Sequence, residues 1–436
     1  MAITDTLGVM VAGAGHEAVE ILADTLGIGV DAGLATLVGG RGRTGVLDAA
    51  LVNGTAAHML DYDDSNSDLF GHLSAAILPS LLSLAESEGA NGRHLLVSFL
   101  AGYEAGCRFG NAVSRFQYTH GWHPTATVGI FAAVSACAVL IGLDDRRTAM
   151  ALGIATHLAS GIKSNFGSMT KPLGVGHASR SALMAVLLAK RGFTSGERAF
   201  EHHHGYFSVF NQNALDTEPL LTPWSPGEKI LDPAKGLKQK RFPCCFAIAP
   251  ILDCVADIRN TEGLDPADIV AIVLRVHPIR FPHIDVPDPR TGLAAKFSAT
   301  YCAARMLVAG RVEVADFEDG GRLVDQWTRE LIARASLQTY RREQLSGAEV
   351  DITTRNGHVL SRSVDAARGA TSDNPLTPAM VSEKFDDCVS RRLGTVAASA
   401  LWQRLQALAD CSDVADLTAL TRFEAPSGDT REVHYG

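Results

Sequence analysis

The stretch Tyr118-Thr-His120-Gly-Trp122-His123-Pro124-Thr-Ala-Thr-Val-Gly129 places His120 and His123 on a glycine-interrupted turn, and small apolar residues continue from it to position 143. This pattern predicts a helix that neighbouring helices can approach closely. Pro124 suits the first helical position, where its missing N–H costs nothing. The N–H groups of a helix start also favour an anion. Two imidazoles beside such an end favour acid–base chemistry on a carboxylated molecule. The alternative is that both are turn residues and Trp122 packs in the core.

The composition is that of a globular protein. Hydrophobic residues make up 46% of the 436 positions and charged residues 20%, and this length predicts two domains. The net charge of −9 argues against a nucleic-acid partner. The eight cysteines form no Cys-x-x-Cys pair, and no export signal is visible at the N-terminus. We therefore expect a reduced, cytoplasmic location.

A membrane span is the first alternative to consider. Residues 126–143 contain no charge over a length that can cross a bilayer. The segment is rich in Ala, Thr, Ser and Gly, however, and lacks a flanking aromatic belt. We therefore predict a central helix buried in a bundle and no membrane association.

A nucleotide site is the second alternative. Residues 9–18, Val-Met-Val-Ala-Gly-Ala-Gly-His-Glu-Ala, imitate a dinucleotide-binding fingerprint, with Asp31 near the position of a ribose-binding acid. The fingerprint requires a preceding strand and a βαβ unit, whereas the flanking sequence favours helix. We expect no nucleotide cofactor.

The first half of the chain is predicted to be helical throughout. Apolar periodicity predicts helices with short joints over 46–60, 75–85, 94–112, 126–143, 147–160 and 177–190. Residues 161–176 are predicted to be a loop, and the prolines of residues 210–236 indicate a domain boundary. These elements predict a helical bundle domain over 1–235.

In the second half of the chain, the sequence pattern predicts strands as well as helices. Helices are expected at 244–258 and 295–309, a strand at 269–277, and a hairpin from 348–354 to 358–364 across Asn356-Gly357. This predicts a smaller α+β domain over 236–372 with about three strands. Helices at 382–393 and 397–408 predict that residues 373–436 return to the bundle. The predicted fold class is mostly α, with a discontinuous bundle and a smaller α+β domain.

Side chains able to carry chemistry cluster near the predicted helix ends. They are Asp61 with Asp63 and Asp64, His72, His120, His123, Lys171, His177 and Tyr301. One interpretation is a metal site, but no His-x-x-x-His or His-Glu-x-x-His spacing exists, and His202-His203-His204 is interpreted as a solvated loop. The other interpretation is that an imidazole removes a proton next to a carboxylate, which Lys171 holds.

Five segments in order resemble the MmgE/PrpD family, which contains 2-methylcitrate dehydratases, cis-aconitate decarboxylases and iminodisuccinate epimerases. They are Asp61-Tyr-Asp-Asp with Gly71-His72, Gly121-Trp-His-Pro-Thr-Ala-Thr127, Met169-Thr-Lys-Pro-Leu173 with Gly176-His-Ala178, Phe242-Pro-Cys-Cys245, and Lys296-Phe-Ser298 with Tyr301-Cys302. The resemblance implies a bundle built from both chain ends, an α+β lid, a homodimer and proton chemistry without metal or other cofactor.

The resemblance also implies roles for five residues. His72 and His123 would transfer protons or bind carboxylate, and Lys171 would be a cationic clamp. Tyr301 would be an acid carried by the lid, and Asp61 would polarise a neighbouring group. Each has a structural alternative, such as a loop cation for Lys171, a core residue for Tyr301 and a helix or turn cap for Asp61. We assign substrate binding to three further residues, His120, His177 and Asp64.

The chain departs from the family pattern at two places. Ala249 stands where the family commonly has a histidine, and the sequence begins at what resembles the second helical stretch of the family. We predict a lyase, a dehydratase or decarboxylase acting on a small di- or tricarboxylic acid. The alternatives are an epimerase of an iminodisuccinate-like acid and, because of Ala249, a catalytically weakened protein that binds carboxylates.

Overall fold

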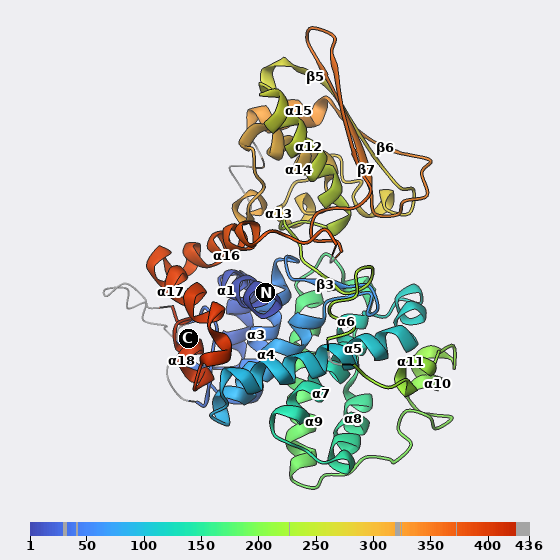
Figure 1. Ribbon diagram of the computed structural model, residues 1–436, viewed down its shortest axis with the longest axis vertical. Coiled ribbons are helices and arrows are strands. Elements are labelled where there is room, and N and C mark those ends of the chain that lie inside the picture. The colour runs from blue at the N-terminus through green and yellow to red at the C-terminus, as the bar shows by residue number, and fades with distance from the viewer. Residues whose placement is uncertain are drawn as a thin grey trace. The chain divides into compact units, whose positions relative to one another are not determined.

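The computed structural model describes residues 1–28, 33–40, 42–225, 227–318, 323, 325–371 and 373–423. Its fold is mostly α, as predicted, with small sheets (Figure 1). The chain divides into two compact units. The first comprises residues 1–59, 66–230 and 388–436, and the second comprises 60–65 and 231–387. The sequence analysis did not anticipate the short 60–65 segment, and its division at 235/236 and 372/373 stays a prediction.

The first unit is a bundle of helices around an apolar core. Its elements are α1 (Ala2–Gly13), α2 (Glu17–Thr25), β1 (Ala35–Thr36), β2 (Arg43–Thr44), α3 (Val46–Met59), α4 (Leu73–Ser87), α5 (Gly92–Thr119), α6 (Pro124–Thr127), α7 (Gly129–Leu140), α8 (Asp145–Leu158), α9 (Thr170–Lys190), α10 (Tyr206–Asn211), α11 (Glu218–Leu221), α17 (Thr395–Gln406) and α18 (Val414–Ala419). Helices α3, α4, α7 and α9 pack against one another and form its centre. Their facing sides are rich in alanine and glycine, which keeps the helix axes close.

Three predicted helices of this unit have other bounds in the structure. The helix expected over 94–112 is α5, which runs seven residues further to Thr119. The helix expected over 126–143 begins at Pro124 and is interrupted at Val128, where ψ is −37° but φ is −115°. The helix expected from His177 begins at Thr170 instead, so Lys171 lies in its first turn and not in a loop. Pro172 does not prevent this start, because a proline in the first turn of a helix lacks only a donor that would be unused.

The contact between α3 and α9 depends on two glycines. A Cβ on Gly54 would lie 2.7 Å from the Cα of Gly176, and a Cβ on Gly176 would lie 2.3 Å from the carbonyl oxygen of Leu51. Neither distance is sterically allowed, so the two helix backbones touch where they cross. No residue larger than glycine fits at either position without displacing a helix.

The second unit is built on a four-stranded sheet. The strand order is β6-β5-β7-β8, formed by β5 (Ile269–Val276), β6 (Ala335–Thr339), β7 (Ala348–Thr354) and β8 (Val359–Val364). The predicted hairpin is confirmed, with Gly357 at φ +83° in its turn. The estimate of about three strands is wrong, because β6 pairs parallel with β5 and was not anticipated.

In the described part of this unit, four helices accompany the sheet. They are α12 (Ala249–Glu262), α13 (Gly292–Ala295), α14 (Ala299–Ala309) and α15 (Gln326–Ala333), and β3 (Ser65–Asn66), β4 (Leu237–Lys238) and α16 (Pro378–Leu393) lie at or near the boundaries of the unit. Helices α12, α14 and α15 pack against the strands of the sheet. Buried side chains of α12, α14, β5 and β7 form one apolar cluster. The helix predicted over 295–309 is split at Lys296–Ser298, where Ser298 caps α14 by accepting a hydrogen bond from Tyr301 N–H.

The dinucleotide-binding alternative is wrong, because the fingerprint requires a strand before it and the structure has a helix there. Residues 2–13 form α1, so no strand precedes Gly13-Ala-Gly15, and these residues join α1 to α2. Asp31 lies outside the described residues. Across the described part of the chain, no single helix has both the length and the apolar composition to cross a bilayer. Only the pair α1 and α2, bent by 79°, reaches that combination.

We predict that Gly176→Ala destabilises the protein although alanine is the better helix former. Overpacking of this kind costs about 1–3 kcal/mol, more than the roughly 1 kcal/mol gained in helix propensity. Urea denaturation measures the difference. Gly174→Ala on the same helix is the matched control, since a Cβ there meets no atom within 4 Å. Equal stability of the two variants would contradict the packing argument.

Candidate active site

The two histidines with predicted proton-transfer roles occupy equivalent positions in the first unit. His72 is the N-cap residue of α4 and His123 that of α6, both with extended backbone, and neither imidazole caps its own helix. His72 is half-buried and His123 is 4% exposed. Each imidazole therefore projects from the start of a helix without capping that helix.

The hydroxyl of Thr125 ties the two helix starts together. It accepts a hydrogen bond of 3.2 Å from the backbone N–H of His72, and Gly71 leaves room for it, since a Cβ there would lie 2.5 Å from Thr125 Oγ1. Ala126 and Thr127 both donate their N–H groups to the carbonyl of His123. Thr127 thereby makes the ordinary first bond of the helix, and Ala126 uses a donor that the predicted anion site would need, so the side chains become the main candidates for binding.

A third imidazole, His58, joins these two. It lies in the last turn of α3, is 1% exposed, and its ring centroid is 4.5 Å from that of His72 and 5.9 Å from that of His123. In the sequence, His58 lies within a predicted helix, and no role was predicted for it. The available signal was its position three residues before Asp61, at the end of a helix with few other polar groups.

The segment 161–166 is joined to the histidine turn by backbone hydrogen bonds. His123 N–H donates to the carbonyl of Gly161 at 3.1 Å, and Lys163 N–H donates to that of Gly121 at 2.8 Å. Lys163 also places its Nζ 3.6 Å from the centroid of the Tyr118 ring, and burial lowers its pKa. These bonds hold the segment beside His123.

Phe166 connects this segment to Lys171. Its ring packs edge-on against His123 with centroids 5.0 Å apart, and Lys171 Nζ lies 5.1 Å from its centroid. A cation at this distance from an aromatic face is weakly attracted to it. Phe166 therefore helps to hold the ammonium on the same side as His123, a role that the sequence analysis did not assign.

A cavity of about 290 Å³ lies at this place in the first unit. It brings together three of the predicted residues, His123, Lys171 and His177, and is also lined by Leu51, Gly161, Ile162, Asn165, Thr170, Leu173 and Gly174. His177 is exposed, and its Nε2 is 3.4 Å from the hydroxyl of Ser181. One ammonium and two imidazoles around a small cavity form a site suited to a compact anion.

His120 does not line this cavity. It follows α5 as an exposed residue, stacks on Phe116 with ring centroids 3.7 Å apart, and has its Nδ1 2.9 Å from the carbonyl of that residue. Its predicted part in substrate binding receives no support from this position.

Buried polar side chains fix the turn that carries His123. Gln117 donates to the Tyr206 hydroxyl and to Asn211, and it accepts from the Thr127 hydroxyl at 2.6 Å. Tyr206 in turn donates to the carbonyl of Thr127 at 2.7 Å. Because all four side chains are buried, breaking one bond leaves a donor or acceptor without water to replace it.

Asp61 belongs to the second unit, where its backbone has φ +52°. Three buried lysines of that unit hold its neighbourhood by donating to main-chain carbonyls. Lys296 donates to Leu60 at 2.7 Å, Lys240 to Asp61 at 2.6 Å, and Lys384 to Tyr62 at 2.8 Å. Lys240 Nζ is also 3.2 Å from the Asp61 carboxylate. Asp61 is thus part of a clamp on the chain segment that follows α3.

The clamp displaces the pKa values of two lysines in opposite directions. Burial acts to lower the pKa of Lys240, but the Asp61 and Asp63 carboxylates outweigh it and raise that pKa. For Lys296 burial prevails, and its pKa falls to about 8. Lys296 belongs to one of the segments that resemble the family, but no role was predicted for any of these three lysines.

The remaining predicted residues are also in the second unit. Asp64 is fully buried in the 60–65 segment, and Tyr301 is fully buried in the apolar cluster, where its hydroxyl donates to the carbonyl of Asp316. Ala249 begins α12 and is buried in the same cluster. The roles predicted for Asp64 and Tyr301 stay predictions.

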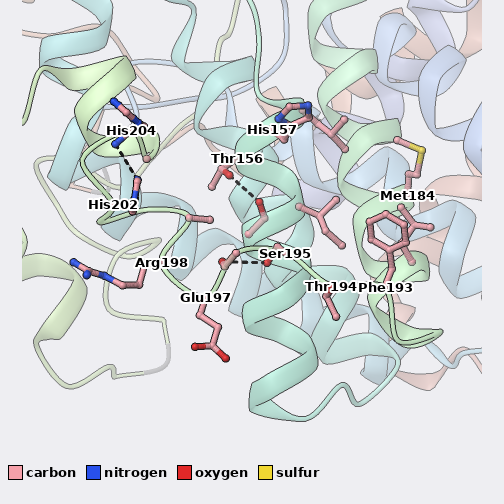
Figure 2. Close-up of a pocket in the computed structure, with 17 residues that line it drawn as sticks. Thr156, His157, Met184, Phe193, Thr194, Ser195, Glu197, Arg198, His202 and His204 are labelled. Carbon is pink, nitrogen blue, oxygen red and sulfur yellow. Dashed lines mark hydrogen bonds between the residues drawn. The ribbon is translucent and has the colours of Figure 1, made fainter.

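A larger cavity of about 860 Å³ lies elsewhere in the first unit, between α8, α9 and residues 193–205 (Figure 2). Apolar side chains such as Ile154, Met184 and Phe193 line it, and Arg198 points away from Met184 and Phe193. None of the predicted catalytic residues reaches it. Its lining suits an apolar molecule better than a polycarboxylate, so the smaller cavity is the candidate site.

The triplet His202-His203-His204 lies at the edge of this larger cavity. All three rings are exposed, as expected for a solvated loop, and the neighbouring imidazoles lower the pKa of His203. Their ring nitrogens also lie within 4.8 Å of one another, a spacing that fits a shared cation. The expected absence of a metal therefore stays a prediction.

Comparison with known proteins gives two family matches. The MmgE/PrpD N-terminal domain matches residues 1–217, and the MmgE/PrpD C-terminal domain matches residues 242–410. Human cis-aconitate decarboxylase is 27% identical over 87% of this chain and 80% of its own length. The mouse protein of that name is 27% identical over 86% and 78%, and a cis-aconitate decarboxylase-like protein of Aspergillus oryzae is 25% identical over 90% and 86%.

We predict that Lys296 gives the stability of the protein a pH dependence above neutrality. Between a folded pKa of about 8 and the ordinary 10.5, the unfolded chain holds a proton that the folded chain has released. The free energy of unfolding contributed by Lys296 therefore rises with pH in that window, by up to about 1.4 kcal/mol per pH unit.

The measurement is chemical denaturation of the wild type and Lys296→Met from pH 7 to 10. The free energy of unfolding of the wild type should increase relative to that of Lys296→Met as the pH rises above about 8. Lys190→Met, at an exposed lysine, is the control. Its difference in unfolding free energy from the wild type should not change over this pH range. A flat difference for Lys296→Met as well would contradict the prediction.

Proposed function

Because the chain belongs to the MmgE/PrpD family, we propose that it is a cofactor-independent lyase acting on a small di- or tricarboxylic acid. The observation that carries the proposal is the cavity of about 290 Å³ lined by His123, Lys171 and His177. These side chains supply a base, a cation and a second polar contact within one compact space. The curated relatives are named as cis-aconitate decarboxylases, which supports lyase chemistry over other classes.

In the proposed mechanism Lys171 holds the carboxylate next to the reacting carbon. Negative charge accumulates there when a proton or CO₂ leaves, and an ammonium already in position stabilises that charge. His123 exchanges the proton, because its imidazole lines the cavity and imidazole is the side chain most often used for proton transfer. His177 binds a second carboxylate. His72 takes part in proton transfer together with His123, since the ring of His58 lies close to both.

Decarboxylation is the branch we favour, on the names of the relatives. The carbon–carbon bond to one carboxylate breaks, CO₂ leaves, and the electron pair remains on the carbon skeleton as an enolate-like species. A proton from the imidazolium then completes the product. In a dehydration, the base would instead remove a carbon-bound proton and hydroxide would leave from the neighbouring carbon.

Two alternatives use the same cavity. An epimerase would return the proton to the opposite face of the same carbon, which requires a second acid. A weakened, carboxylate-binding protein is the second alternative, because Ala249 stands where the family commonly has a histidine. The family resemblance further supports our proposals of a homodimer and of a polarising role for Asp61.

The test is proton NMR in D₂O with cis-aconitate, 2-methylcitrate, citrate and iminodisuccinate. We expect a new product signal, with deuterium at the carbon that received the proton. The product distinguishes decarboxylation, dehydration and epimerisation. If every acid stays unchanged but one raises the melting temperature, binding without turnover is the function.

The site assignment is tested with His123→Ala and Lys171→Met. Loss of a proton-transfer group lowers turnover by about 10²–10⁴-fold, so His123→Ala should lose kcat with its melting temperature retained. Lys171→Met should raise KM and lower kcat, because the cation contacts both substrate and transition state. The matched control is His94→Ala, at an exposed histidine of α5. Unchanged turnover in His123→Ala would remove this residue from the mechanism.

A further inference from the structure

Gly174 lies on the face of α9 that lines the 290 Å³ cavity. It is three residues from Lys171 and three from His177, so the three positions follow one another along one side of the helix. With a rise of 1.5 Å per residue, Lys171 and His177 begin about 9 Å apart along the axis. Gly174 is midway between the two groups proposed to bind carboxylates.

Nothing in the fold requires a glycine at this position. Its φ is not in the left-handed region, and a Cβ built on it meets no atom within 4 Å. Two residues later, a Cβ on Gly176 would strike the backbone of α3 at 2.3 Å, so packing explains that glycine but not Gly174. A glycine inside a helix costs about 1 kcal/mol relative to alanine. The missing side chain therefore lowers helix stability and leaves only open space in return.

We propose that Gly174 is a specificity-determining residue that keeps the middle of the cavity open for a branched carboxylic acid. The inference rests on the proposed function and extends it. Lys171 and His177 hold carboxylates at the two ends of the substrate, and the branch between them occupies the space above Gly174. An unbranched dicarboxylate does not need this space. The site is thus adapted to a tricarboxylate or a similarly branched acid.

The experiment measures binding by calorimetry with His123→Ala present in every protein, so that cis-aconitate is not consumed during the titration. It compares the wild-type residue at position 174 with Gly174→Ala and Gly174→Leu in that background. The probes are cis-aconitate, a branched tricarboxylate, and maleate, an unbranched dicarboxylate. Gly174→Ala should weaken cis-aconitate by about tenfold, which corresponds to about 1.4 kcal/mol, and should leave maleate within about threefold. Gly174→Leu should weaken cis-aconitate further, because its larger side chain fills the space that the branch uses.

Folding is checked by the melting temperature without ligand. Gly174→Ala should equal or exceed the wild type, which keeps the test valid even if Gly174→Leu folds poorly. Gly45→Ala is the control, because a Cβ at Gly45 also meets no atom within 4 Å and Gly45 does not line the cavity. It should bind both acids as the wild type does.

Three outcomes would overturn the inference. If both Gly174 variants bind cis-aconitate like the wild type, the space is unused, while the proposed function stands. If Gly174→Ala loses both acids equally, the position does not discriminate between branched and unbranched ligands. If the wild type binds neither acid, the proposed function fails and this inference fails with it.

Discussion

The first unit depends on the backbone contact between α3 and α9. Gly54 and Gly176 remove the two side chains that would separate the helices, so Leu51 of α3 reaches the cavity that α9 lines. The same contact fixes the end of α3, which carries His58, relative to the start of α9, which carries Lys171. Groups from distant parts of the sequence therefore take their positions from one close helix crossing.

The turn at His123 is held by a different device. Gln117, Thr127 and Tyr206 form a buried hydrogen-bonded network, and Gly161 accepts the backbone N–H of His123. Uncharged hydrogen bonds in a water-free environment hold a precise geometry, because each broken bond leaves a polar group unsatisfied. The imidazole is thus held in place before any ligand binds, which lowers the entropic cost of bringing the base to the substrate.

Local signals in the sequence predicted much of the fold. Pro124 marks a helix start, Asp144 caps α8 by accepting from the backbone N–H of Arg147, and Asn356-Gly357 forms the hairpin turn. Two of the predictions that failed concern the strand β6 and the start of α9. Strand β6 has few β-branched residues and exists because it pairs parallel with β5 from more than sixty positions away. Residues 161–176 were predicted to be a loop, whereas α9 already begins at Thr170 and accommodates Pro172 in its first turn.

The site was predictable only where residue type carried the information. His123, Lys171 and His177 were identified from the sequence, and they share a cavity in the structure. His58 was missed because a polar residue within an apolar helix gives no sign of its neighbours, which come from α4 and α6. Phe166 was missed for the same reason, since an aromatic residue in a loop does not indicate what it packs against.

Two different kinds of interaction hold the residues assigned to the site. In the first unit, packing and uncharged hydrogen bonds position His123. In the second, Asp61 takes a left-handed backbone conformation that three buried ammonium groups secure through adjacent carbonyls. Burying cations is costly unless their hydrogen bonds are satisfied, and these carbonyls satisfy them. Because burial lowers the pKa of Lys296 to about 8, a rise in pH above neutrality removes one charge from the support of Asp61, whereas the raised pKa of Lys240 preserves its charge. The support of His123 is instead the uncharged network of Gln117, Thr127 and Tyr206, together with backbone hydrogen bonds to the segment that carries Lys163.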